Sequence, residues 1–347
     1  MSDVATLNLF QQQEANRRRT VYLIIGFVLF FAWLGFGGDL IYYLATADAP
    51  QEAQRHVFPW FGLLLTAFGA GTAWYGYSTG PLKVLWATGA REVTTPQTDQ
   101  ERQLVNVVEE MAIAAAVPRP RIWIDPDADP NAFATGMDPA HAHICVTQGL
   151  LDILNRDELQ GVIGHELGHV KNLDIRLMTT LAALVGAVVL MHDGTSRLMG
   201  RGIGFGGGSG AGGEGSRGGK KGGDLVLLLL AVWIISWILA PIITQCMAMA
   251  VSRGREYLAD AMGAQFTRNP LALASALEKI DAADAPTTSI KGGTAHLCIA
   301  DPLGRQVNLH EGPLANFFGT HPPMNLRVIR LKGMGYAQLK QQGGSAA

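Results

Sequence analysis

The stretch GVIGHELGHVKNLD (residues 161–174) contains a His-Glu-x-x-His pattern in which His165 and His169 are four positions apart. On an α-helix, side chains at positions i and i+4 lie on one face, so the two imidazoles can bind a single metal ion. Glu166 then stands beside any water bound to that ion, where it can act as a general base. The spacing therefore predicts a helix that holds a catalytic zinc ion and activates water for hydrolysis.

The composition indicates a membrane protein. Of the 347 residues, 48% are hydrophobic and 16% are charged, and the mean hydropathy is positive. The formal net charge of −2 leaves no basic domain to neutralise phosphates, which argues against nucleic-acid binding. The three cysteines have no CxxC spacing, so they are typical of a reducing compartment and provide no thiolate zinc site.

Four apolar runs predict about four transmembrane helices. They cover residues 21–45, 57–77, 177–191 and 225–250. The first run, roughly 25 residues long, can cross a bilayer and follows three arginines, and only a short loop joins it to the second. A cleavable signal peptide is the alternative for the first run, but its length and the second run that follows argue against it. Between the third and fourth runs, 14 of the 24 residues 200–223 are glycine, which predicts a flexible loop.

The segments between and after these runs are soluble in character. Residues 101–117 have apolar side chains at helical spacing, and residues 121–125 (RIWID) and 143–147 (HICVT) are predicted strands with a loop between them. Asn155, followed three positions later by Glu158, predicts the start of the helix that carries the histidines. Further helices are predicted at residues 255–260, 270–281 and 327–331.

These observations predict a mainly α membrane protein in six segments. They are a cytosolic segment (1–20), a membrane hairpin (21–80), the first half of a catalytic domain (81–176), a second membrane hairpin (177–250), the second half of that domain (251–342) and a frayed tail (343–347). The distribution of basic residues weakly favours a cytosolic location for both halves of the catalytic domain.

The two histidines leave a catalytic zinc ion one protein ligand short, since such sites usually have three. If the third and fourth runs form an antiparallel hairpin, the chain returns near residue 250 on the side from which it entered. Glu256 then lies at a depth similar to that of the histidines, so we predict it to be the third ligand. Asp260, one turn further on the same helix face, is predicted to orient a zinc-bound imidazole.

Three parts of the sequence together resemble the HtpX-type membrane metallopeptidases, which are relatives of the type I CAAX prenyl proteases. They are residues 161–174, the segment SRGREYLAD (252–260) and the motif THPP (320–323) with Arg327 after it. The resemblance covers most of the chain and implies a zincin-like peptidase domain of the gluzincin type with a small β-sheet. It implies one Zn²⁺ per chain, with these site residues: His165, His169 and Glu256 as ligands, Glu166 as catalytic base, and Asp260 completing ExxxD.

The resemblance also implies a location and partners. The protein would be integral to the bacterial inner membrane, with an active site that faces the cytoplasm. It would hydrolyse membrane or unfolded protein substrates in protein quality control. Asn131, Ala132, Phe133 and Ala134 would bind substrate at a strand edge. His321 would stabilise the oxyanion, and Arg327 would be buried.

This sequence departs from the family pattern in having no acidic residues just before Arg327 and in its long glycine loop. Neither departure affects the predicted zinc ligands.

Two other functions are compatible with the motif. A CAAX prenyl-type protease would carry more membrane spans than the four runs predict. A catalytically silent membrane scaffold would have no need of Glu166 beside its first ligand. The sequence leaves the substrate, the oligomeric state and the side of the glycine loop open.

Overall fold

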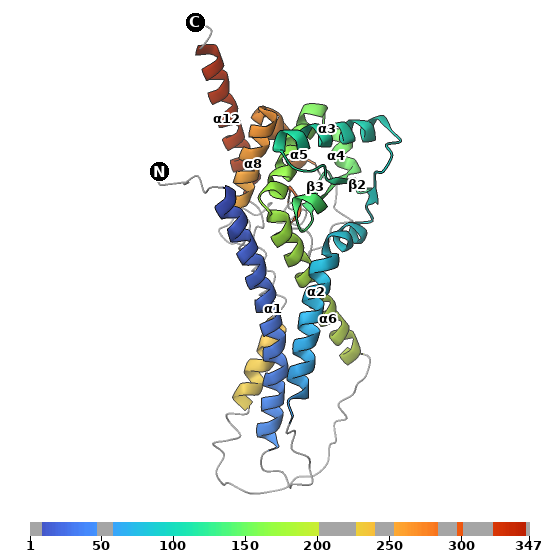
Figure 1. Cartoon of the computed structure of the whole chain (residues 1–347), viewed down its shortest axis with the longest axis vertical. Coiled ribbons are helices and arrows are strands. Elements are labelled where there is room, and N and C mark those ends of the chain that lie inside the picture. The colour runs from blue at the N-terminus through green and yellow to red at the C-terminus, as the bar shows by residue number, and fades with distance from the viewer. Residues whose placement is uncertain are drawn as a thin grey trace. The chain divides into compact units, whose positions relative to one another are not determined.

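The computed structural model describes residues 9–46, 58–200, 227–239, 253–283, 297–300 and 322–344 (Figure 1). The chain divides into two compact units. The first consists of Met1–Val21, Tyr77–Ala183 and Cys246–Ala347, and the second of Tyr22–Gly76 and Leu184–Gln245. The predicted glycine-rich loop, apart from Gly200, and His321 lie outside the described residues, as does the end of the predicted tail.

A small mixed sheet forms part of the first unit. Its strands are β1 (Arg91–Glu92), β2 (Arg121–Asp125), β3 (Ala132–Thr135) and β4 (His143–Thr147), in the order β1-β2-β4-β3. β2 and β4 are parallel and have the bounds predicted from the sequence, whereas β1 and β3 pair antiparallel with their neighbours. The segment between β2 and β4 was predicted to be a loop only. It contains β3, which pairs with the nearby β4 and is bridged on its other side from Phe133 to Cys298, a residue far along the chain.

Helices make up most of the described chain, as predicted. In the first unit they are α3 (Asp99–Ala115), α4 (Gln148–Ile153), α5 (Arg156–Lys171), α8 (Arg253–Thr267), α9 (Pro270–Asp281) and α12 (Met324–Gly344), with a 3₁₀ turn at Pro139–His141. α5 begins at the predicted capping box, in which the side chains of Asn155 and Glu158 each bond the other residue's backbone nitrogen. α9 has its predicted bounds. α12 is longer than the predicted helix 327–331, since it begins at Met324 and ends at Gly344.

α5 lies at the centre of the first unit and contacts α3, α8, α9 and β3 (Figure 1). Its buried side chains Ile163 and Leu167 belong to one apolar core with residues of the sheet, α3 and α9. The apolar positions predicted for the 101–117 helix, Leu104, Val107, Val108 and Met111, are buried in the same core. The helix with the two histidines is thus held by packing on several sides.

Three long helices contain all or most of the first three predicted apolar runs. They are α1 (Leu9–Ala45), α2 (Trp60–Thr88) and α6 (Asp174–Gly200). Among the described residues, only α1 has a stretch long and apolar enough for a membrane span, the 35 residues Gln11–Ala45. Part of the fourth run forms the shorter apolar helix Leu227–Leu239. Within the second unit, the Asp39 carboxylate accepts a hydrogen bond from the Gly62 nitrogen at 2.7 Å. Of the four spans predicted, the described residues thus provide one candidate helix by length and composition.

Candidate metal centre

His165 and His169 lie one turn apart on α5, and Glu256 lies near the start of α8. Their facing atoms are close together. Nε2 of His165 is 3.2 Å from Nε2 of His169, and the Glu256 carboxylate is 3.6 Å from the first nitrogen and 3.5 Å from the second. A tetrahedral zinc site with bonds of about 2.0–2.1 Å separates its ligand atoms by roughly 3.3–3.4 Å. The two nitrogens and one carboxylate therefore suit zinc in both chemistry and spacing.

Glycines bring the two ligand-bearing helices together. A Cβ atom on Gly263 of α8 would lie 2.9 Å from the backbone nitrogen of His165, and one on Gly168 of α5 would lie 3.2 Å from Cα of Ala259. A Cβ atom added to Gly164 would lie 3.3 Å from Cα of Gly263. This close packing of α5 on α8 was not predicted from the sequence. The glycines of GVIGHELGH, spaced so that they share one helix face, could have indicated it.

The second ring nitrogen of His165 is held by a buried ion pair. Nδ1 of His165 lies 2.9 Å from Asp260, the carboxylate predicted to orient this ring, and Nε2 faces His169 and Glu256. Arg327 is fully buried and donates to both Asp260 oxygens, at 2.9 and 2.7 Å, and to the Ile299 carbonyl at 2.8 Å. Burial would raise the pKa of Asp260, but Arg327 outweighs it and lowers this pKa to about 2.

His169 is oriented by two residues that the sequence analysis did not place in the site. Its Nδ1 lies 3.0 Å from Asp174, whose other oxygen accepts a hydrogen bond of 2.7 Å from the buried Asn16 amide of α1. Leu173, between α5 and α6, has φ of 60°, and this left-handed turn lets Asp174 reach back to His169. Burial opposes a charge on His169, but Asp174 and Glu256 outweigh it and raise its pKa to about 9.

Glu166 is buried and lines the same small cavity as Ala134 of β3, His169 and Glu256. Neither of its carboxylate oxygens has a hydrogen-bond partner among the described residues. Burial is the main reason that its pKa is raised to about 7, and the nearby Glu256 carboxylate adds to the effect. A carboxylate with free oxygens and a pKa near neutrality can both accept and donate a proton at physiological pH.

A small cavity of about 20 Å³ opens onto these groups and has room for about one water. The residues that line it include Ala134, Glu166, His169, Arg255, Glu256 and Leu297. Of the predicted substrate-binding residues, Ala134 lines this cavity. Asn131 instead donates to the Ala300 carbonyl at 3.0 Å, and the Ala132 carbonyl accepts from Ile299 at 2.9 Å.

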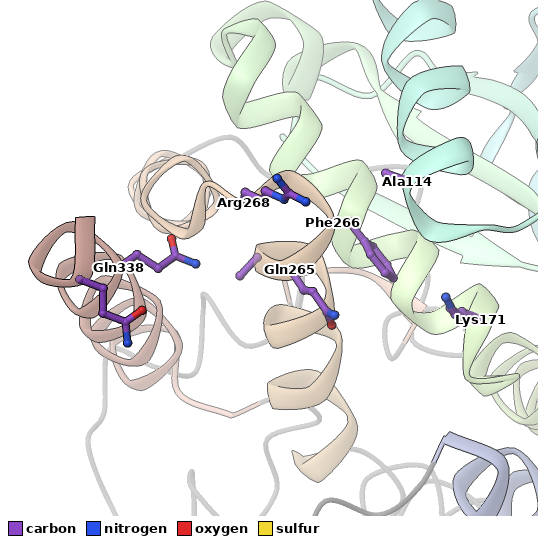
Figure 2. Close-up of a pocket in the computed structure, with 8 residues that line it drawn as sticks. Ala114, Lys171, Gln265, Phe266, Arg268 and Gln338 are labelled. Carbon is purple, nitrogen blue, oxygen red and sulfur yellow. The ribbon is translucent and has the colours of Figure 1, made fainter. Parts of the chain in front are cut away.

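A larger hollow of about 970 Å³ shares none of its lining residues with the metal cluster. Figure 2 shows Gln265 and Phe266 from α8, Arg268 just after it, Lys171 from α5 and Gln338 from α12 around the hollow. The described residues that line the hollow include the cations Lys171 and Arg268 but no carboxylate. Lys171 donates a hydrogen bond to the Ala115 carbonyl at 2.7 Å.

The chain is similar to known peptidases. Residues 98–335 match Peptidase family M48. "Protease HtpX homolog" of Thermoanaerobacter pseudethanolicus is 38% identical over 331 residues, which cover 94% of this chain and 98% of that protein. The protein of the same name from Dictyoglomus turgidum is 36% identical and covers 94% and 95%. The crystal structure of S. mikatae Ste24p is similar with a TM-score of 0.41 and 17% identity, covering 94% of this chain and 67% of that one.

Proposed function

Because this chain belongs to peptidase family M48 and is therefore a metallopeptidase, we propose that it hydrolyses peptide bonds within membrane or misfolded proteins, using one zinc ion per chain. His165, His169 and Glu256 would hold the ion. The observation that carries this proposal is the separation of their facing atoms by 3.2–3.6 Å, which fits tetrahedral zinc. Two carboxylates support the arrangement, since Asp260 orients His165 and Asp174 orients His169.

Zinc would supply a water of lowered pKa and a Lewis acid for the scissile carbonyl. Glu166 accepts the proton of the attacking water and later donates it to the leaving amine. Its position next to a metal ligand, its free oxygens and its raised pKa all suit that double role. A metal site that only stabilises the fold would not require a buried, unpaired carboxylate beside the ion, which disfavours the silent scaffold.

The substrate is proposed to lie near Ala134, at the end of the strand edge that the cavity borders. Asn131, Ala132 and Phe133 would support that edge through their contacts with residues 298–300. His321 is proposed to stabilise the oxyanion, as the family resemblance implies.

We also propose a location in the bacterial inner membrane, with about four spans and the active site in the cytoplasm. The HtpX relatives and the long apolar helix α1 support membrane association. The proposed hairpins are residues 21–80 and 177–250, and the peptidase halves are 81–176 and 251–342. Labelling of a cysteine placed at Ser209 from each side of the membrane tests this, and labelling from the cytoplasmic side alone would rule out four spans.

The peptidase assignment is tested by comparing the wild type with Glu166→Gln in detergent at controlled zinc. We expect the wild type to cut unfolded casein and itself. The variant should bind the same amount of zinc and cut neither, because an amide cannot accept the proton. Equal cleavage by both proteins would remove Glu166 from the mechanism. Intact substrate with both proteins, at one zinc per chain, would instead favour the scaffold.

A further inference from the structure

Arg255 is a buried cation with unused donors. Only 9% of the residue is exposed, and neither Nε nor Nη1 has a hydrogen-bond partner among the described residues. Nη2 has only a weak acceptor, the Met178 sulfur at 3.0 Å. Buried donors are nearly always paired in folded proteins, because an unpaired one loses its bonds to water without replacement. Arg255 therefore requires an acceptor that the described chain does not supply.

The cavity where such an acceptor would sit also contains the catalytic groups. Arg255, Glu166 and His169 all line it, together with the apolar side chains of Ala134 and Leu297. A peptide placed for attack by the water that Glu166 activates would lie outside this cavity, which has room for about one water, and would reach into it with a single carbonyl oxygen. Such a peptide brings carbonyl oxygens, one for each residue.

The charge around Arg255 indicates which kind of oxygen fits. Nη1 lies 3.9 Å from Asp174, so the positive charge already has a partner, although the distance is too long for a hydrogen bond. The Asp174 oxygens are themselves engaged by His169 and Asn16. Among the described residues, the guanidinium thus has a counter-charge but no acceptor for Nε and Nη1, which suits a neutral carbonyl better than a carboxylate.

We propose that Arg255 is a substrate-binding residue that donates hydrogen bonds to a backbone carbonyl of the bound peptide, next to the bond that is cut. This inference rests on the proposed peptidase function. Recognition through the backbone is independent of side-chain identity and does not require the free end of a chain. It therefore gives the site the character of an endopeptidase of broad sequence preference.

The test measures binding in a protein that cannot cut. The full-length Glu166→Gln chain is loaded with zinc in detergent and titrated with a fluorescein-labelled unfolded peptide, made with an amidated or a free C-terminus. We expect Arg255→Met to raise the Kd about 10- to 100-fold for both peptides. Arg255→Lys, which keeps the charge and loses the forked donors, should also weaken binding. Arg268→Met, which changes an exposed cation just after α8, should leave the Kd unchanged.

Zinc affinity, measured by competition with a chelator, separates binding from positioning. The proposal requires it to stay the same in Arg255→Met. A loss of zinc affinity with an unchanged peptide Kd would overturn the proposal and assign Arg255 to holding Asp174. A free C-terminus bound at least tenfold more tightly, with that preference lost in Arg255→Met, would also overturn it, in favour of a carboxylate site. Cleavage by the wild type is measured separately, so a failed peptidase assignment is not confused with either result.

Discussion

Replacement of Arg327 by methionine tests whether the buried ion pair behind His165 stabilises the fold. Arg327 is fully buried, donates two hydrogen bonds to Asp260 and lies 3.5 Å from Glu256. Methionine fills much of the same volume but leaves two buried carboxylates without their cation. Removing one partner of a buried ion pair costs about 3–5 kcal/mol. For a unit of this size, that corresponds to a Tm lower by roughly 6–20 °C.

The assay is thermal unfolding of the metal-free chain in detergent. A double variant, Arg327→Met with Asp260→Asn, provides the internal control because it removes both charges. It should be less destabilised than the two single changes added together, by about 0.5–3 kcal/mol. Lys332→Met removes an exposed cation of the same helix and should change the Tm little. The reasoning is refuted if Arg327→Met lowers the Tm by less than about 3 °C, or if the two changes are additive.

Three further predictions concern the metal and the helix contact. Because the pKa of metal-free His169 is raised to about 9, zinc must displace a proton below that pH. The association constant of zinc should therefore rise up to about tenfold per pH unit toward pH 9. An association constant that does not change between pH 7 and 9 would contradict this. Asn16→Leu, which removes the donor to Asp174, should lower zinc affinity roughly tenfold by chelator competition, whereas unchanged affinity would make Asn16 a packing residue only. Gly263→Ala should destabilise the chain by about 1–3 kcal/mol, because the added methyl meets the backbone of α5. Gly333→Ala is the control and should be neutral or stabilising, because nothing lies near its added methyl. Equal unfolding midpoints for the two variants would disprove the close helix contact.

Local sequence patterns predicted the elements that depend on neighbouring residues. The α5 capping box and the strands β2 and β4 were readable because their signals lie within a few positions. Glu256 could be proposed as a ligand from helix spacing and an assumed hairpin, and the structure brings its carboxylate to both histidines.

The features missed from the sequence depend on contacts between distant residues. Asn16 reaches Asp174 across 158 positions, and Phe133 of β3 forms a bridge with Cys298 far along the chain. Nε and Nη1 of Arg255 have no hydrogen-bond partner in the described part of the chain, and a buried donor of this kind has no sequence signature. Tertiary packing decides such features, so periodicity and propensity cannot show them.

The glycines between α5 and α8 also bear on the order in which the site forms during synthesis. Gly161, Gly164 and Gly168 each cost α5 about 1 kcal/mol of intrinsic helix stability relative to alanine, so α5 depends on its neighbours to stay helical. α8 is among those neighbours, and it lies much later in the chain. A growing chain on the ribosome therefore carries both histidines before it has the helix that packs against them and Glu256. The cluster proposed to bind the metal can be completed only after residues 253–267 have been made.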